Sequence, residues 1–180
     1  MRKLIVTEFM SLDGVIENPQ WTFKYWNDET SGFKTEETSN NESLLLGRVT
    51  YEGFAQAWPQ RTDEASGGVY FNGTRKYVVT STLDKLDWNN SVAIKGDIVA
   101  EITKLKQEDG PDLVVHGSGK LVQFLLANNL VDTVRILMYP VVLGKGQKMF
   151  EDGTAASMKL VSARPFSSGV IGLVYEPTAE

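Results

Sequence analysis

Two glycines around a serine, Gly117-Ser118-Gly119, form the segment of this chain that is best suited to hold an anion. The apolar run before it, 113–115, predicts a strand covered on both faces, and the apolar spacing after it predicts a helix. The first N–H groups of a helix have no intrahelical partner, and the helix dipole is positive at that end. A phosphate or pyrophosphate suits such a turn, because glycine lets an anion come close to the backbone. An ordinary strand–helix connection would explain the same residues.

A second segment, earlier in the chain, repeats this pattern. Residues 42–46 predict a strand, and Gly47 then opens a helix that we expect to run to about Trp58. Arg48 and Thr50 lie in its first turn, where a guanidinium or a hydroxyl could contact a bound anion. Thr80-Ser81 ends another predicted strand, 75–80. Because ligands of mostly parallel sheets bind beyond the carboxyl ends of the strands, we expect these ends to meet at one cleft.

Asp13 is the predicted catalytic residue of this cleft. It follows the first and central strand, 3–10, in a sharp Asp13-Gly14 turn. Its carboxyl could donate a proton to a substrate or bind it, water being the other proton source. Because Asp-Gly is strong turn chemistry, a purely structural role explains the residue as well. Further along, Asn27 or Asp28 suits the N-cap of a helix to about residue 38.

An aromatic group lies in the loop after the first turn, and it consists of Trp21, Phe23, Tyr25 and Trp26. Such a group could form a lid or a wall for a flat ligand. Core packing beneath a long loop would place the same residues together.

Composition excludes several classes of function. The chain of 180 residues is 42% hydrophobic and 23% charged, which predicts one ordinary globular domain spanning 1–180. Its net charge of −5, without a basic block, argues against a nucleic-acid or membrane-surface binder. The absence of cysteine excludes disulfides and zinc–sulfur sites and fits the cytoplasm. One histidine without an acidic cluster predicts no metal site, and no run is long enough for a membrane span.

Alternating strands and helices, followed by strands alone, predict the fold class. We expect a three-layer α/β/α arrangement around a mostly parallel mixed sheet with an antiparallel C-terminal edge. The last strands are predicted at 131–143, 158–165 and 170–175, the final two forming a hairpin. Ile171, Leu173 and Tyr175 of that hairpin could form the seam of a homodimer or pack on the core.

Several of these segments together resemble the dihydrofolate-reductase-like superfamily, and specifically the pyrimidine reductase domain of riboflavin biosynthesis. The resemblance covers about residues 4–175. It is carried by these segments, in this order and spacing: Ser11-Leu-Asp-Gly14, Leu46-Gly-Arg-Val-Thr-Tyr-Glu52 with Trp58, Val78-Val-Thr-Ser-Thr-Leu83, His116-Gly-Ser-Gly119, Leu130-Val-Asp132, and Pro140-Val-Val-Leu-Gly-Lys-Gly146 with Phe150.

The resemblance implies an NADPH-binding reductase of a small heterocyclic substrate, most like 5-amino-6-(5-phosphoribosylamino)uracil reductase. A non-catalytic module that holds a nucleotide or a flat metabolite is the alternative. Thr82 stands where related reductases often carry a basic residue, so Arg48 would be the main cation near the 2′-phosphate. The carboxylate that protonates folate in dihydrofolate reductases has no clear match here; Asp28 lies in roughly the right region, and a helix N-cap explains it as well. The implied contacts are Gly47, Arg48 and Thr50 on the adenosine-phosphate side, Thr80 and Ser81 at the adenine ribose, Gly117, Ser118 and Gly119 at the pyrophosphate with Lys120 and Leu121 alongside, and Phe9 and Ile16 at the nicotinamide.

Overall fold

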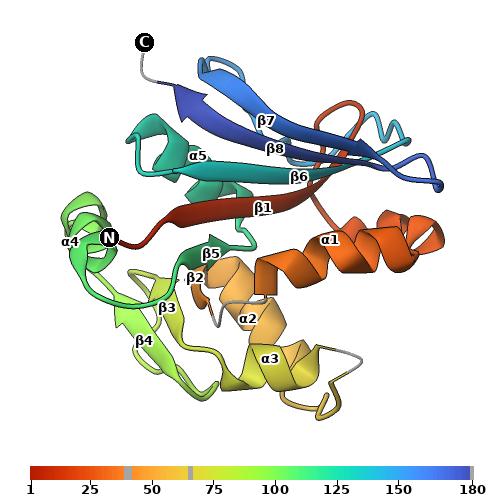
Figure 1. Ribbon diagram of the computed structural model, residues 1–180. Helices are drawn as coiled ribbons and strands as arrows, with labels where there is room; N and C mark the ends of the chain where they lie inside the picture. Colours follow the sequence, from red (N-terminus) through yellow and green to blue (C-terminus); the bar gives the residue numbers. More distant parts are fainter. Residues whose placement is uncertain (39–41, 65–66, 179–180) are drawn as a thin grey trace.

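A computed structural model describes residues 1–38, 42–64 and 67–178, and all of its named strands belong to one eight-stranded sheet (Figure 1). The strand order is β4-β3-β2-β5-β1-β6-β8-β7. The elements in chain order are β1 (Leu4–Ser11), η1 (Pro19–Tyr25), α1 (Asp28–Thr38), β2 (Ser43–Gly47), α2 (Arg48–Ala57), α3 (Gly68–Gly73), β3 (Lys76–Val79), β4 (Ser91–Ile94), α4 (Ile98–Gln107), β5 (Leu113–Val115), α5 (Gly119–Ala127), β6 (Thr133–Tyr139), β7 (Ser157–Pro165) and β8 (Ile171–Thr178).

The sheet is mixed in the way that the sequence predicts. Every neighbouring pair from β4 across to β6 is parallel, whereas β8 pairs antiparallel with both β6 and β7. Helices connect the parallel strands along the chain, because a parallel connection needs a crossover, except that residues 80–90 join β3 to β4 without a named helix. A tight turn suffices between β7 and β8. The predicted antiparallel C-terminal edge is therefore confirmed.

Helices cover both faces of the sheet, and β2 shows why. Leu44 and Leu46 point into one hydrophobic cluster, while Leu45 points into another, because successive strand side chains alternate between faces. The cluster of Leu45 includes residues of α4 and α5. The cluster of Leu44 includes residues of α2 and α3, and α1 packs on the same side through Phe33. This gives the three layers that the alternation of strands and helices predicts (Figure 1).

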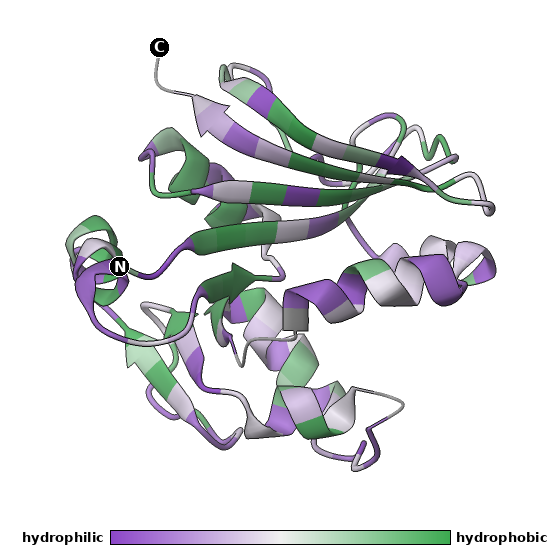
Figure 2. Ribbon diagram, viewed as in Figure 1, coloured by the Kyte–Doolittle hydropathy of each residue, from purple (hydrophilic) through white to green (hydrophobic). Residues whose placement is uncertain are grey.

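Hydropathy follows this layering (Figure 2). The central strands β1 and β5 are hydrophobic along most of their length, whereas α1 is mostly hydrophilic. A polar helix lying on a sheet must find polar partners beneath it, since buried polar groups are costly without hydrogen bonds. The contacts of α1 are therefore part of the site described below.

The predicted strand 131–143 is too long, since β6 ends at Tyr139. Pro140 follows it and has no N–H to continue the ladder. The chain instead folds back over the end of β1, where the Leu12 N–H donates to the carbonyl of Val141 at 2.8 Å. The Met149 N–H likewise donates to the carbonyl of Gly14 at 2.9 Å. The loop after β6 is thereby attached to the turn after β1.

The C-terminal hairpin packs on the core through Leu173 and Tyr175, as one of the two expectations has it. Ile171 is 38% exposed, and Leu160 and Val161 of β7 are about half exposed. A homodimer across this edge stays a prediction. No helix in the described parts of the chain is long and apolar enough to cross a membrane.

Candidate functional site

The two glycine bends lie side by side, at the carboxyl ends of the neighbouring parallel strands β2 and β5. The Gly47 N–H donates to the Gly117 carbonyl at 3.3 Å. A Cβ on Gly47 would lie 2.3 Å from the Ser118 Oγ, so no larger residue fits there without movement. The strands β3, β2, β5 and β1 are consecutive in the sheet, and their carboxyl ends form one edge. The four predicted strand ends thus lie at the same end of the sheet, and a cleft between them stays a prediction.

Two helices begin at these bends. Gly47 precedes α2 and Ser118 precedes α5, and neither residue caps its helix with a side-chain hydrogen bond in the described structure. The Gly117–Ser118 peptide bond is cis. The first N–H groups of both helices therefore remain open to a ligand, and two positive helix ends lie next to each other. This arrangement suits a group with more than one negative charge, such as a pyrophosphate.

Ile16 and Thr50 meet the same turn from two other elements. A Cβ on Gly119 would lie 2.8 Å from Ile16 Cδ1, and one on Gly117 would lie 3.0 Å from Thr50 Oγ1. Both glycines are needed because neighbouring side chains already take this space. Gln147, which no sequence argument singled out, also reaches Gly119, its Nε2 lying 2.9 Å from the Cβ position.

Lys120 and Leu121, the two predicted ligand residues in the first turn of α5, differ in exposure. Lys120 is exposed and free to meet an anion, whereas Leu121 is only 6% exposed and belongs to the core. The Leu121 side chain therefore holds the helix against the sheet. Only its backbone N–H, one of the open donors of this turn, is suited to a ligand.

Thr80 and Ser81 follow β3, next to β2 and its glycine bend. The Thr80 hydroxyl accepts hydrogen bonds from the N–H groups of Thr82 at 3.2 Å and Leu83 at 3.0 Å, and so it shapes the turn. Ser81 is exposed. Arg48, the predicted phosphate ligand, is exposed at the start of α2 and pairs with Glu52 at 2.7 Å. A surface pair of this kind is weak, so the guanidinium is available to a bound phosphate.

Asp13 acts as an anchor for the loop after β6. Its carboxylate accepts hydrogen bonds from the Ser11 hydroxyl at 2.6 Å and from the N–H groups of Leu143 at 3.1 Å and Gly144 at 2.7 Å. These donors, the Ser11 hydroxyl above all, lower the pKa of Asp13 to about 2. A carboxylate held in this way is ionised at neutral pH and has no proton to give. Its geometry favours the structural role, and its catalytic role stays a prediction.

Phe9 does not face the glycine bends in the way that Ile16 does. Its ring packs edge-on against Trp26, with centroids 6.0 Å apart, and against Tyr139 at 5.9 Å. The Lys34 ammonium lies 5.2 Å from the ring centroid. Phe9 therefore lies on the α1 side of β1, between the sheet and a half-exposed tryptophan.

Part of the aromatic group packs on the core, whereas its role as a lid or a wall for a flat ligand stays a prediction. Trp21 and Tyr25 pack edge-on against the buried Tyr139, with centroids 5.4 and 5.9 Å apart, which confirms core packing for these two. Phe23 is 71% exposed. The N-cap of α1 is Asn27, whose Oδ1 accepts the Thr30 N–H at 3.0 Å. Asp28 is exposed in the first helical turn, which gives it no buried acid site.

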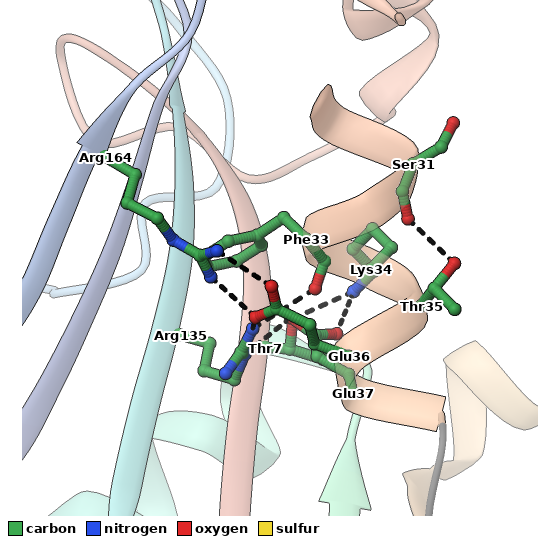
Figure 3. A network of polar contacts seen from close by, with 9 residues as sticks. All are labelled: Thr7, Ser31, Phe33, Lys34, Thr35, Glu36, Glu37, Arg135 and Arg164. Atoms are coloured by element: carbon green, nitrogen blue, oxygen red, sulfur yellow. Dashed lines mark hydrogen bonds and ion pairs between the residues drawn. The ribbon is translucent and has the colours of Figure 1, made fainter. Parts of the chain in front are cut away.

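A polar network beneath α1 was not predicted from the sequence (Figure 3). Glu37 is buried, and its carboxylate accepts the Thr7 hydroxyl at 2.9 Å and the Arg135 Nε–H at 3.0 Å. Lys34 donates to the same carboxylate and to the Thr7 hydroxyl. Glu36, at the exposed side of the network, binds Arg164 through both carboxylate oxygens. The hydrophilic helix α1 is thus attached to β1 and β6 by charge-assisted hydrogen bonds.

Glu8 and His116, near the bends in the described structure, are partly buried residues that each hold one buried polar atom without a partner. Among the residues that the structure describes, neither Glu8 Oε1 nor His116 Nε2 has a hydrogen-bond partner. Burial raises the pKa of Glu8 to about 8, although the Lys34 ammonium opposes this shift. Burial, assisted by Lys34, holds the pKa of His116 well below its usual range. Both groups are therefore neutral at pH 7. Glu8 has one signal in the sequence, as the only acidic residue in the run 4–10.

A metal cluster is absent among the described residues, and a cavity of the fold lies away from the glycine bends. The described residues contain no group of three or more His, Cys, Asp and Glu side chains that could hold a metal. A cavity of about 520 Å³ lies at the opposite, amino-terminal end of the strands, where Arg2, Ser43 and Gly110 line it. It has no part in the convergence of the glycine bends.

Comparisons with known proteins agree with this fold. Residues 2–172 match the family described as the RibD C-terminal domain. The Bacillus subtilis protein YyaP, which is uncharacterized, is 31% identical over 179 residues, with 97% of this chain and 94% of YyaP covered. YwjB, also uncharacterized and from the same species, is 26% identical over 174 residues, covering 94% of this chain and 95% of YwjB.

Solved structures show the same architecture. A putative riboflavin biosynthesis protein from Shewanella has a TM-score of 0.77 at 21% identity, covering 98% of this chain and 99% of its own. Dihydrofolate reductase from Enterococcus faecalis, complexed with NADP(H) and RAB-propyl, has a TM-score of 0.66 at 16% identity, covering 98% of this chain and 97% of its own. At these identities the structures establish the fold alone. The match over residues 2–172, together with the glycine bends that it includes, shows that the chain belongs to the RibD C-terminal domain family.

Proposed function

We propose that this protein is an NADPH-dependent reductase of a small heterocyclic compound. The observation that carries the proposal is the contact between the Gly47 and Gly117–Ser118 bends, which places two uncapped helix ends at one edge of the sheet. Family membership supports a reductase, and one solved structure with the same fold is a dihydrofolate reductase complexed with NADP(H).

The residues at this edge fit such a dinucleotide. The open N–H groups of α2 and α5 would bind the pyrophosphate, and Arg48 and Lys120 are the exposed cations in their first turns. Ser81 and Thr80 would lie towards the adenosine half, because β3 neighbours β2. Ile16, packed against Gly119, would limit the nicotinamide half. Bound NADPH supplies a hydride, and the protein contributes position and electrostatics.

The substrate would lie on the α1 side of β1. Phe9 and Trp26 offer flat apolar surfaces there, and Lys34 is the adjacent cation. A small aromatic or partly reduced ring has the shape to stack against such residues. This placement supports a heterocyclic substrate class.

A binding module without catalytic activity is the second proposal, and one observation favours it. The hydrogen bonds that hold Asp13 ionised leave it without a proton to donate. Turnover under NADPH with pyrimidine, pterin and folate compounds separates the two proposals. Saturable NADPH binding without loss of the reduced-nicotinamide absorbance would support the module.

Replacement of Arg48 tests the dinucleotide site directly. A hydrogen bond to a charged group contributes about 1.5–3 kcal/mol, so Arg48→Ala should weaken NADPH about 10-fold or more. NADH, which lacks the 2′-phosphate, should lose less. Both affinities are measured by titrating the fluorescence of the reduced nicotinamide.

Arg75→Ala is the matched control, because Arg75 stacks on Tyr77 at the amino-terminal end of β3, away from the bends. It should leave both affinities unchanged. Equal losses for NADPH and NADH in Arg48→Ala would remove Arg48 from the 2′-phosphate. Failure of the unmodified protein to bind either cofactor would refute the reductase proposal.

A further inference from the structure

Glu8 lies beside Gly117, in the second of the two glycine bends. The last paired residues of β1 and β5 are Val6 and Val115, so Glu8 and Gly117 are each two residues further along parallel neighbours. Glu8 Oε1 lies 3.7 Å from the position that a Gly117 Cβ would take. Thr50 Oγ1 lies 3.0 Å from the same position. Glu8 thus shares the space around Gly117 with a residue of α2.

This carboxyl is buried but has no partner for one of its oxygens. Glu8 Oε1 makes no hydrogen bond among the residues that the structure describes. Buried polar atoms are almost always hydrogen-bonded, and the exceptions gather where a ligand or a reaction needs them. The neighbouring α5 helix end is open as well, since Ser118 provides no side-chain cap. Two independent features therefore indicate a ligand at this position.

We propose that Glu8 lines the dinucleotide site beside Gly117 as a neutral acid, and that NADPH binds only while this carboxyl keeps its proton. The inference rests on the proposed function and deepens it. A protonated carboxyl can donate a hydrogen bond to an oxygen of the cofactor. An ionised carboxyl at the same position would repel the phosphates that the two helix ends attract, and burial makes that repulsion stronger.

The charged and titratable groups around Glu8 determine the pH at which its carboxyl ionises. Lys34 is the facing charge from α1, and it is itself paired with Glu37. His116, which follows β5, packs its neutral ring against Phe54 and Phe71, while α2 presents the uncharged Thr50 near Gly117. Burial outweighs the attraction of Lys34, so the pKa of Glu8 is raised to about 8. Glu8 should therefore be neutral at pH 7 and ionised at pH 9.5.

NADPH titration between pH 6.5 and 9.5 tests the proposal. The unmodified protein should bind with nearly constant affinity up to about pH 7.5 and then lose affinity, approaching 10-fold per pH unit, because binding must restore one proton. Glu8→Gln, which is neutral at every pH and of similar shape, should match it at pH 6.5. At pH 9.5, about 1.5 units above the pKa of Glu8, the variant should bind about 30-fold more tightly than the unmodified protein.

The heat of binding in buffers of different ionisation enthalpy gives an independent readout. Near pH 9 the unmodified protein should take up close to one proton per NADPH, and Glu8→Gln should take up none. Glu176→Gln, an exposed acid on β8, is the control and should behave as the unmodified protein. The pKa of Lys76 is lowered by burial to about 8 as well, but Lys76 is present in all three proteins.

The outcomes separate the two proposals. NADPH binding with the same pH slope in Glu8→Gln and in the unmodified protein would overturn the role of Glu8 and leave the reductase proposal intact. Loss of binding by Glu8→Gln at every pH, with circular dichroism showing a folded protein, would also overturn it, since a neutral side chain would then not suffice. Absence of NADPH binding by the unmodified protein at pH 6.5 would refute both.

Discussion

Gly47→Ala tests the closest approach in the site, between the α2 and α5 bends. Gly47 has φ −73° and ψ 157°, an extended conformation that alanine adopts without strain. The effect of the substitution must therefore come from the new methyl group. That carbon would lie 2.3 Å from Ser118 Oγ, well inside the optimal separation of about 3.5–4.0 Å.

The expected loss of stability depends on which atoms of Ser118 can move away from the new methyl group. The Ser118 hydroxyl can rotate, but its Cβ and backbone nitrogen would remain 3.2 Å from the added carbon. Overpacking of this kind typically costs about 1–3 kcal/mol. We expect the free energy of unfolding to fall within that range. NADPH affinity should fall at least about 10-fold, because the two helix ends can no longer approach each other.

Urea unfolding and NADPH titration measure these changes, and two further variants sharpen them. In Gly47→Ala/Ser118→Gly the Cβ and hydroxyl of residue 118 are removed, so the double variant should lose less stability than the sum of the singles by about 0.5–3 kcal/mol. Gly53→Ala is the control in the same helix, with nothing within 4 Å of its added carbon. It should be stabilising by about 0.5–1 kcal/mol. Unchanged stability and NADPH affinity in Gly47→Ala would refute the contact between the bends.

Three acidic residues, Glu37, Glu36 and Asp13, give the remaining predictions. Glu37→Gln should lower the free energy of unfolding by about 3–5 kcal/mol, since it leaves Lys34 and Arg135 buried beside an uncharged amide. Glu36→Gln, which alters the exposed part of the same network, should cost about 1 kcal/mol or less in urea unfolding, and equal costs would contradict the assigned burial. Asp13→Asn should lower the melting temperature at pH 6. Because the folded pKa of Asp13 is lowered to about 2, its stabilisation is present above the unfolded value near 3.8 and disappears as the pH falls through 2. The melting temperatures of Asp13→Asn and the unmodified protein should therefore converge as the pH falls, and a gap that does not narrow between pH 6 and pH 2 would argue against the ionised anchor.

Local patterns in the sequence were enough for the sheet and for the glycine bends. Apolar runs and turn residues predict the strands, and the order of elements predicts parallel strands with an antiparallel edge. The bends at Gly47 and Gly117 follow from the same reasoning, because glycine before a helix start has a local cause. Pro140 is the place where the pattern misleads, since the apolar residues after it belong to a returning loop and not to β6.

The partners of the acidic side chains were decided by the tertiary structure. Asp13, Glu8 and Glu37 all appear in the sequence as acids near predicted elements. Asp13 becomes an anchor because a loop some distance along the chain brings the N–H groups of Leu143 and Gly144 to it. Glu8 keeps its proton because neighbouring strands bury it beside Gly117, and Glu37 stays paired because β6 supplies Arg135. Residue type and spacing determine which side chains can carry a charge. Burial and hydrogen-bond donors determine which of these side chains are ionised. The tertiary structure decides this, because burial and donors both depend on contacts between segments far apart in the chain.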